Sequence, residues 1–224
     1  MTQTYAISQA IESLSQVEEK FNLVQSLDDA FFVEWFENLP MLTDAEKATL
    51  DHYKQRFLAH RRRGELSEGT VDRLLVSPLL DLAGLYEPRF VIDSEASVEV
   101  TAVDDDELYR GRIDVLIIEH RFWVLVVEEK ATRIDMETAI PQALTYMAAS
   151  PNLERSAGAD AASRPLYGMV TNGNNFAFLK LQQRQQKEYA ISDTFSLRSR
   201  QNKLYDILQV LKQIRDCLTT LTSL

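Results

Sequence analysis

The sequence predicts an α/β layered domain, in which a central β-sheet is flanked by helices. Three observations support this: helical periodicity in the N-terminal quarter, apolar β-branched stretches in the middle, and a long helical pattern at the C-terminal end. The elements follow in the order helices, strand group, helix, hairpin and helix, which is typical of layered domains and not of bundles or sandwiches. With 224 residues, 45% of them apolar, the chain can bury a substantial core.

The first 64 residues are predicted to form an all-helical extension, packed on the core of a main domain that covers residues 65–224. Apolar residues recur there at helical spacing: Ile7, Ile11, Leu14, Val17 and Phe21. An aromatic cluster follows: Phe31, Phe32, Trp35 and Phe36. Its spacing favours core packing over stacking on bases. Thr43 and Glu46 match a capping box, which indicates that another helix begins there.

The main domain is expected to open with a helix from about Ser67 to Gly84, in which Pro78 causes a kink or an end. Strand patterns then occupy residues 90–92, 96–103, 112–118 and 122–129. A helix is expected over about residues 136–149. Two more strands, residues 166–171 and 176–181, are expected to form a hairpin, because the Asn-Gly-Asn-Asn sequence between them tolerates positive φ.

The last helix is expected over about residues 200–221. Its apolar residues follow one another at intervals of three and four: Ile207, Leu211, Ile214, Leu218 and Leu221. This stripe either packs on the protein's own core or forms a homodimer contact, since two heptads are short for a coiled coil.

Charge and composition limit the classes of function. A formal net charge of −10 argues against a protein that coats nucleic acid through bulk electrostatics. The basic stretch that ends in Arg61, Arg62 and Arg63 is either a local DNA-binding segment or the solvated end of a helix. The single cysteine, Cys217, cannot form an internal disulfide, and neither a signal peptide nor a long apolar run is found. We therefore expect a cytoplasmic protein with no membrane segment.

Two carboxylates stand inside the most apolar part of the chain, Gly111 to Lys130. Asp114 and Glu128 lie in predicted central strands, where an unpaired buried charge is costly. Side chains alternate along a strand, so Glu128 and Lys130 point to the same side. A turn centred near Arg121 would set Asp114 opposite Glu128. A loop of odd length aligns all three groups, whereas one of even length does not.

This pattern indicates hydrolysis of a phosphodiester. Carboxylate oxygens, a backbone carbonyl and water suit Mg²⁺ (or Mn²⁺), which would relieve the repulsion between Asp114 and Glu128. Beside such an ion, Lys130 would orient the attacking water and balance the charge of a phosphorane-like transition state. The plain alternative is structural, with two strand-end charges and Lys130 as their salt-bridge partner.

Asp114, followed after thirteen intervening residues by Glu128-Glu129-Lys130, resembles the motif of the PD-(D/E)xK nucleases. Other segments are similar, in order, to parts of the N-terminal nuclease domain of type I restriction enzyme R subunits. They are Glu68-Gly-Thr-Val with Ser77-Pro-Leu-Leu, Gln142-Ala-Leu-Thr-Tyr146, and YGMVTNGNNFAFLKL at residues 167–181. The resemblance implies a restriction-endonuclease-like mixed central sheet flanked by helices.

The resemblance also implies a metal-dependent DNA endonuclease. It suggests two sets of residues: metal ligands at Asp114, Glu128, Glu129 (through its carbonyl) and Glu68, and further catalytic residues at Lys130, Gln142 and Tyr146. If the chain binds DNA, we expect the contacts at Arg61, Arg62 and Arg63 of the basic stretch and at Arg112. No GxxxxGK[ST] motif occurs, so the type I motor is not expected here, and a motor or specificity protein would be a separate partner.

Alternatives remain open at this point. Gln142, Tyr146 and Glu68 could instead be an exposed helix residue, a core residue and a partner of the helix dipole, respectively. For the whole chain, the alternative to an enzyme is a weakly active or inactive nuclease-fold module that binds DNA or protein.

Overall fold

The computed structural model describes residues 3–102, 107–119, 122–150 and 164–221. Within these ranges nine strands form one sheet with the order β1-β4-β5-β6-β7-β8-β2, while β3 pairs with β4 and β9 with β7. The strands are β1 (Gln3–Ala6), β2 (Leu23–Gln25), β3 (Phe90–Thr101), β4 (Glu107–Glu119), β5 (Phe122–Glu129), β6 (Leu166–Thr171), β7 (Asn175–Gln183), β8 (Lys187–Ile191) and β9 (Phe195–Ser196). The pairs β1–β4, β2–β8 and β5–β6 are parallel and the others antiparallel. The predicted α/β class with a mixed central sheet is therefore confirmed.

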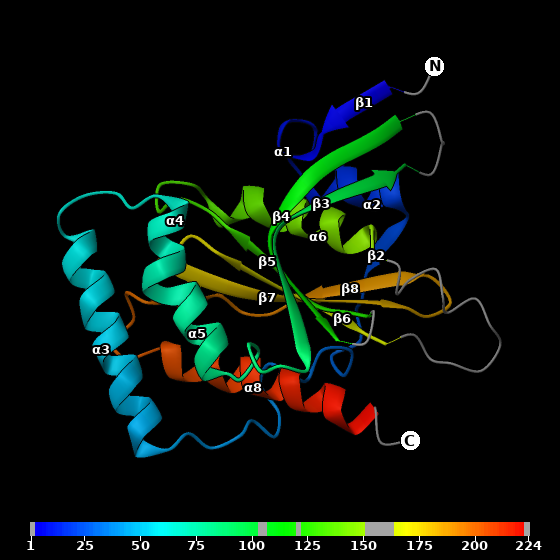
Figure 1. Ribbon diagram of the computed structural model, residues 1–224. Helices are drawn as coiled ribbons and strands as arrows, with labels where there is room; N and C mark the ends of the chain where they lie inside the picture. Colours follow the sequence, from blue (N-terminus) through cyan, green and yellow to red (C-terminus); the bar gives the residue numbers. More distant parts are fainter. Residues whose placement is uncertain (1–2, 103–106, 120–121, 151–163, 222–224) are drawn as a thin grey trace.

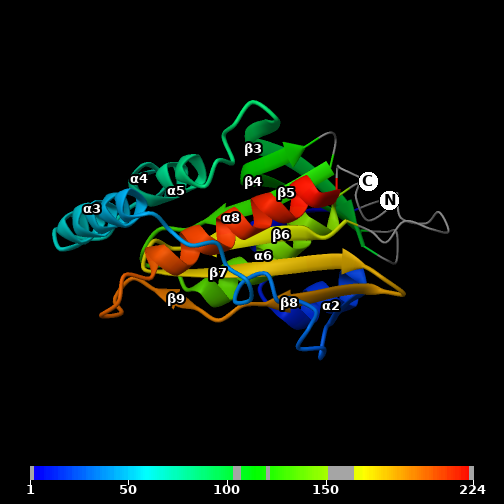
Figure 2. The ribbon, with the colours of Figure 1, turned by 90° about the horizontal axis from the view of Figure 1, so that it is seen from below.

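Helices cover both faces of the sheet (Figures 1 and 2). They are α1 (Ile7–Ala10), α2 (Leu14–Phe21), α3 (Asp44–Arg61), α4 (Glu68–Val71), α5 (Ser77–Leu82), α6 (Met136–Ala148) and α8 (Leu204–Leu221). One hydrophobic core lies between the sheet and α1, α2 and α6, and a second lies between the sheet and α3, α4, α5 and α8. Over the described ranges, no helix combines the length and the apolar character needed to cross a lipid bilayer.

The prediction of an all-helical segment over residues 1–64 is wrong. Helices α2 and α3 are present and each begins with a capping box, but β1 and β2 join the sheet at the two ends of its strand order. β1 pairs with β4 and β2 with β8, both far along the chain. Strands of three or four residues form through such distant pairing and are too short to show a period of their own. The N-terminal segment is therefore part of the sheet.

The aromatic cluster lies between β2 and α3, where residues 26–43 form no α-helix. Phe31 and Phe32 are buried in the core, as predicted, and Trp35 packs partly against it. Phe36, by contrast, is 46% exposed. The cluster is thus mainly a core feature, although it is not presented by a helix.

The helix predicted after the basic stretch continues past Pro78, but its hydrogen bonding changes between α4 and α5. A π-helical turn, η1 (Asp72–Val76), separates α4 from α5. Pro78 has no N–H to donate to the Leu74 carbonyl, and a wider turn accommodates the proline ring. The Leu74 carbonyl instead accepts a hydrogen bond from Arg56 Nη2 of α3, at 3.4 Å. The predicted kink is therefore a π turn that contacts α3.

The C-terminal helix α8 packs on the protein's own core. Ile207, Leu211 and Ile214 of the predicted stripe are fully buried. The side chains of Leu218 and Leu221 lie outside the described part of the chain. Packing on the core is thus the alternative that the described stripe residues support, and a homodimer stays a prediction.

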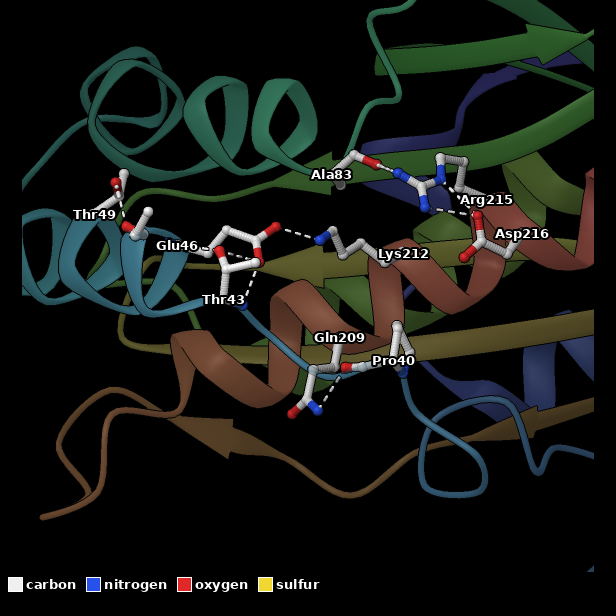
Figure 3. Close-up of polar contacts among 10 residues, drawn as sticks. Pro40, Thr43, Glu46, Thr49, Ala83, Gln209, Lys212, Arg215 and Asp216 are labelled. Atoms are coloured by element: carbon white, nitrogen blue, oxygen red, sulfur yellow. Dashed lines mark hydrogen bonds and ion pairs between the residues drawn. The ribbon is translucent and has the colours of Figure 1, made fainter.

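Polar contacts join α8 to distant parts of the chain (Figure 3). The contacts are Gln209 Nε2 to the Pro40 carbonyl (2.9 Å), Lys212 to Glu46, and Arg215 Nη1 to the Ala83 carbonyl (2.8 Å). They connect α8 with the segment before α3, with α3 itself and with the end of α5. The helices on this face of the sheet therefore form one connected layer.

Candidate functional site

The register between β4 and β5 determines how Asp114 lies relative to Glu128. The two pairs nearest the turn are Glu119 with Phe122 and Ile118 with Trp123. If this register continued along the strands, Asp114 would lie opposite Val127. A one-residue shift next to Ile117 changes the register and brings Asp114 level with Glu128. The predicted register of Asp114 with Glu128 is therefore present, but a β-bulge creates it, and the two side chains do not line the same cleft. The predicted centre of the turn, Arg121, lies outside the described residues.

Asp114 lies where β4 and β5 separate. Its Oδ2 accepts a hydrogen bond from the backbone N–H of Glu129 at 2.6 Å. Beside it in β3, Glu95 has φ of 60°, a left-handed conformation that is uncommon for glutamate. Asp114 lines a cleft of about 300 Å³, together with Glu68, Asp72, Glu95 and Glu129. Strand separation thus opens an acidic cleft at this end of the sheet.

Glu128 and Lys130 lie on the opposite side of β5 from the Glu129 side chain, because side chains alternate along the strand. Glu128 is 2% exposed, and its Oε1 accepts a hydrogen bond from Lys130 Nζ. Its Oε2 is buried and has no hydrogen-bond partner among the described residues. The Glu129 carboxylate, whose role the sequence leaves open, is the one that lines the cleft with Asp114. The site therefore has an open acidic side and a buried ion pair beneath it.

Negative charge is in excess at this site. Burial and the charge of Asp114 raise the pKa of Glu128 to about 8. Burial and the charges of Asp72 and Asp114 raise the pKa of Glu129 to about 9. Burial also raises the pKa of Asp114, against the effect of the hydrogen bond from the Glu129 N–H. The carboxyl groups of this site therefore favour binding protons, or another cation, at neutral pH.

Lys130 only partly offsets this charge. Burial by itself would lower the pKa of the Lys130 ammonium, but the charge of Glu128 and the hydrogen bond to it outweigh burial and raise the pKa. Lys130 is therefore a cation that stays charged next to Glu128.

The groups present fit a hard divalent cation such as Mg²⁺ or Mn²⁺, which prefers oxygen ligands. Such an ion would offer a partner to the unpartnered Oε2 of Glu128 and would offset the excess of carboxylates. Glu68, at the exposed start of α4, borders the same cleft. Across the described ranges, however, no three carboxylate, imidazole or thiol groups form a complete metal-binding group on their own. Backbone carbonyls and water would have to complete the ligand set.

Gln142 and Tyr146 lie one turn apart on α6, and both are buried. A Cβ at Gly111 of β4 would lie 2.5 Å from Tyr146 Cε1, so this close approach of helix and strand requires glycine. Burial and the charges of Glu128 and Asp114 raise the pKa of Tyr146. Gln142 Nε2 donates to the Ser8 carbonyl at 3.5 Å, and its Oε1 has no partner within the described chain. Gln142 is thus not a plain exposed residue, and Tyr146 is a core residue beside the site.

The turn between β6 and β7 anchors the loop that follows β5. Asn172 Nδ2 donates to the Ile134 carbonyl at 2.8 Å, and Asn174 Nδ2 donates to the Thr132 carbonyl at 3.2 Å. Thr132 in turn exchanges two hydrogen bonds with Leu66, just before α4. The sequence predicts this hairpin correctly, but its anchoring role was not foreseen. The signal was present in the two turn asparagines, which become buried.

Several residues of the cleft wall were not predicted, among them Asp72, Ser77 and Tyr86. The first two lie on the helix that contains the π turn, and Tyr86 follows α5. Their segment shows only an apolar helical pattern in the sequence, which indicates packing and carries no sign of a site.

The arginines predicted to contact DNA lie in two places. Arg61, Arg62 and Arg63 end α3 and lead into α4 (Figure 1). Arg112 lies on β4, is exposed, and pairs with Glu95 of the cleft wall at 3.0 Å. Arg112 therefore borders the site, and DNA contact by any of these arginines stays a prediction.

Comparison with known proteins does not assign this chain to a family. No protein-family model matches the sequence, and no curated protein shows significant similarity to it.

Proposed function

We propose that this chain is a metal-dependent DNA endonuclease with a restriction-endonuclease-like fold, similar to the type I R-subunit nuclease domain but without a motor. The main support is the alignment of Asp114 with Glu128-Glu129-Lys130 where β4 and β5 separate. A purely structural ion pair would not need the additional carboxylates that raise the pKa of Glu128. Their excess is what a cation-dependent hydrolase requires.

In this proposal Asp114, Glu128 Oε2 and the Glu129 carbonyl hold Mg²⁺ or Mn²⁺, with Glu68 as a further carboxylate at the rim. A bound ion of this kind polarises the phosphate and lowers the pKa of its water. Lys130 shares its ammonium between Glu128 and the attacking water, and so orients the water and offsets the charge that develops on the phosphate.

Two residues of α6 contribute to the site from the face of the sheet that this helix covers. Gln142 offers its unpartnered Oε1 to the nucleophilic water or, through its amide, supports the phosphate. Tyr146 holds β4 at Gly111, three residues before Asp114, and so is a positioning residue.

Cleavage of circular DNA, supercoiled or single-stranded, tests this function. The wild-type protein is expected to cut in the presence of Mg²⁺ and not in EDTA. Asp114→Asn and Lys130→Met are expected to lose activity by on the order of 100-fold, with folding intact by circular dichroism. The matched control is Glu99→Gln, an exposed carboxylate that pairs with Arg110, which should cut like the wild type. Unchanged cleavage in both site variants would contradict the proposal.

One observation favours a second candidate, a nuclease-fold module that binds DNA or protein with little turnover. Glu128 is almost fully buried and already engaged by Lys130, so a cation can reach it only if this pair rearranges. Calorimetric titration with Mn²⁺, followed by the cleavage assay, separates the two candidates. Metal binding without cleavage of any DNA form would support the module.

A further inference from the structure

A second cleft adjoins the acidic one and carries the opposite charge. It has a volume of about 510 Å³ and lies between α3 and the helix that contains the π turn. Its walls include Tyr53, Arg56, Arg73, Ser77, Asp81 and Tyr86. Ser77 and Tyr86 also line the acidic cleft, so the two clefts share a wall. A carboxylate-lined section therefore passes directly into an arginine-lined one, which we term the basic cleft.

Arg73 lies across the boundary between the two clefts. It lines the basic cleft, and its Nη1 donates to the carbonyl of Gly69 in the wall of the acidic cleft at 3.4 Å. At the same boundary Tyr86 OH donates to Ser77 Oγ at 3.4 Å, and Ser77 Oγ donates to Asp72 at 2.6 Å. A phosphate bound by Arg73 would thus lie next to the acidic cleft and not inside it.

Arg56 is held in position for a ligand. Its Nη2 donates to the Leu74 carbonyl, and its guanidinium lies over the Tyr53 ring, with 5.2 Å between Cζ and the ring centroid. Its Nε is buried without a hydrogen-bond partner among the described residues. Within the same residues neither Arg56 nor Arg73 forms an ion pair, and Asp81 is the one carboxylate of the cleft wall. The basic cleft therefore carries a net positive charge that the protein leaves available.

We propose that the basic cleft binds the nucleic-acid strand next to the cleavage point, and that this strand is unpaired there; the inference rests on the proposed function. Arg56 and Arg73 offer planar donors to successive phosphates. The rings of Tyr53 and Tyr86 offer faces on which unpaired bases stack. With a net charge of −10, the protein is poorly suited to hold a duplex through extended phosphate contacts. A short basic cleft with aromatic walls suits one separated strand.

Fluorescence anisotropy tests this with the full chain in EDTA, so that binding is measured without cleavage. The probe is a labelled oligonucleotide, used alone and paired with its complement. We expect the single strand to bind more tightly than the duplex. Arg73→Gln should weaken single-strand binding about tenfold and lower the salt dependence by about one phosphate contact. Tyr53→Leu should weaken binding about tenfold with the salt dependence unchanged.

Two further variants serve as controls. Arg73→Lys keeps the charge and should retain the salt dependence. Arg184→Gln removes an arginine that lies between β7 and β8, pairs with Asp28 and Glu188 and does not line the basic cleft, and it should bind like the wild type. Wild-type affinity in both Arg73→Gln and Tyr53→Leu, or duplex binding as tight as single-strand binding, would overturn the inference.

The outcomes also separate this inference from the proposed function. If the wild type cuts DNA but Arg73→Gln and Tyr53→Leu both bind normally, the role of the basic cleft is contradicted and the proposed nuclease function is not. If the wild type binds a single strand through Arg73 but cuts no DNA, strand binding by the basic cleft is supported and the proposed nuclease function is contradicted.

Discussion

In the described part of the chain, two lysine–glutamate pairs include a buried side chain, one at the candidate site and one on the opposite side of the sheet from α6. Lys130 pairs with Glu128, whereas Lys180 pairs with Glu34 at 2.5 Å. Each pair leaves one glutamate Oε2 buried without a hydrogen-bond partner in the described chain. An unpartnered oxygen alone therefore does not distinguish a site from a structural contact.

The surroundings of the two pairs differ. Lys180 Nζ also donates to the Phe31 carbonyl at 2.7 Å, and Tyr167 OH donates to Glu34 Oε1 at 2.9 Å. Burial and the charge of Glu34 raise the pKa of Tyr167, so its hydroxyl keeps the proton that it donates. Donors thus converge on Glu34. Glu128 instead has carboxylates around it, and this excess of negative charge marks the site.

Replacing each of the two lysines should give the largest difference in stability between the two pairs. Lys180→Met leaves Glu34 buried without its cation and is expected to lower the free energy of unfolding by about 3–5 kcal/mol. Lys130→Met should cost only about 1 kcal/mol, because Glu128 can take up a proton at a pKa of about 8. Urea-induced unfolding at neutral pH measures both. An equally large loss in Lys130→Met would show that both pairs are structural.

The pH dependence of the free energy of unfolding should also report the excess of carboxylates at the candidate site. The folded-state pKa values of Glu128 and Glu129 are raised to about 8 and about 9, from an ordinary value of 4.5. Their protonated forms favour the folded state, so this stability is present below pH 4.5 and is lost as pH rises through the folded-state values. In EDTA, the free energy of unfolding should therefore fall by at least about 2 kcal/mol between weakly acidic and weakly alkaline pH.

The double variant Glu128→Gln/Glu129→Gln checks the origin of this slope. It should be less sensitive to pH than the wild type, because neither amide titrates. A double variant with the wild-type slope would assign the pH dependence to other groups.

Much of the fold follows from local patterns. The apolar run of β5 and the Asn-Gly turn of the β6–β7 hairpin are features of a few neighbouring residues, and both elements form as predicted. The capping box at Thr43 and Glu46 begins α3 for the same reason. The strand alternation that sets Glu128 beside Lys130 is also local.

The features that the sequence does not reveal depend on contacts between residues that are far apart in the chain. β1 and β2 exist because β4 and β8 pair with them, and the shift next to Ile117 depends on how β5 lies on β4. The same holds for the cleft, because the helix with the π turn brings Asp72 to Glu129. The charged residues on β4 and β5 could thus be predicted, but Asp72, Glu95 and the side of β5 that opens to solvent could not.

The most direct test of the metal site is anomalous diffraction from crystals of this protein soaked in Mn²⁺. We expect one strong peak bound by Asp114 and Glu128, with Lys130 turned away from Glu128 Oε2, and no peak at Glu34. An absence of bound Mn²⁺ at Asp114, with the Lys130–Glu128 pair unchanged, would contradict the account.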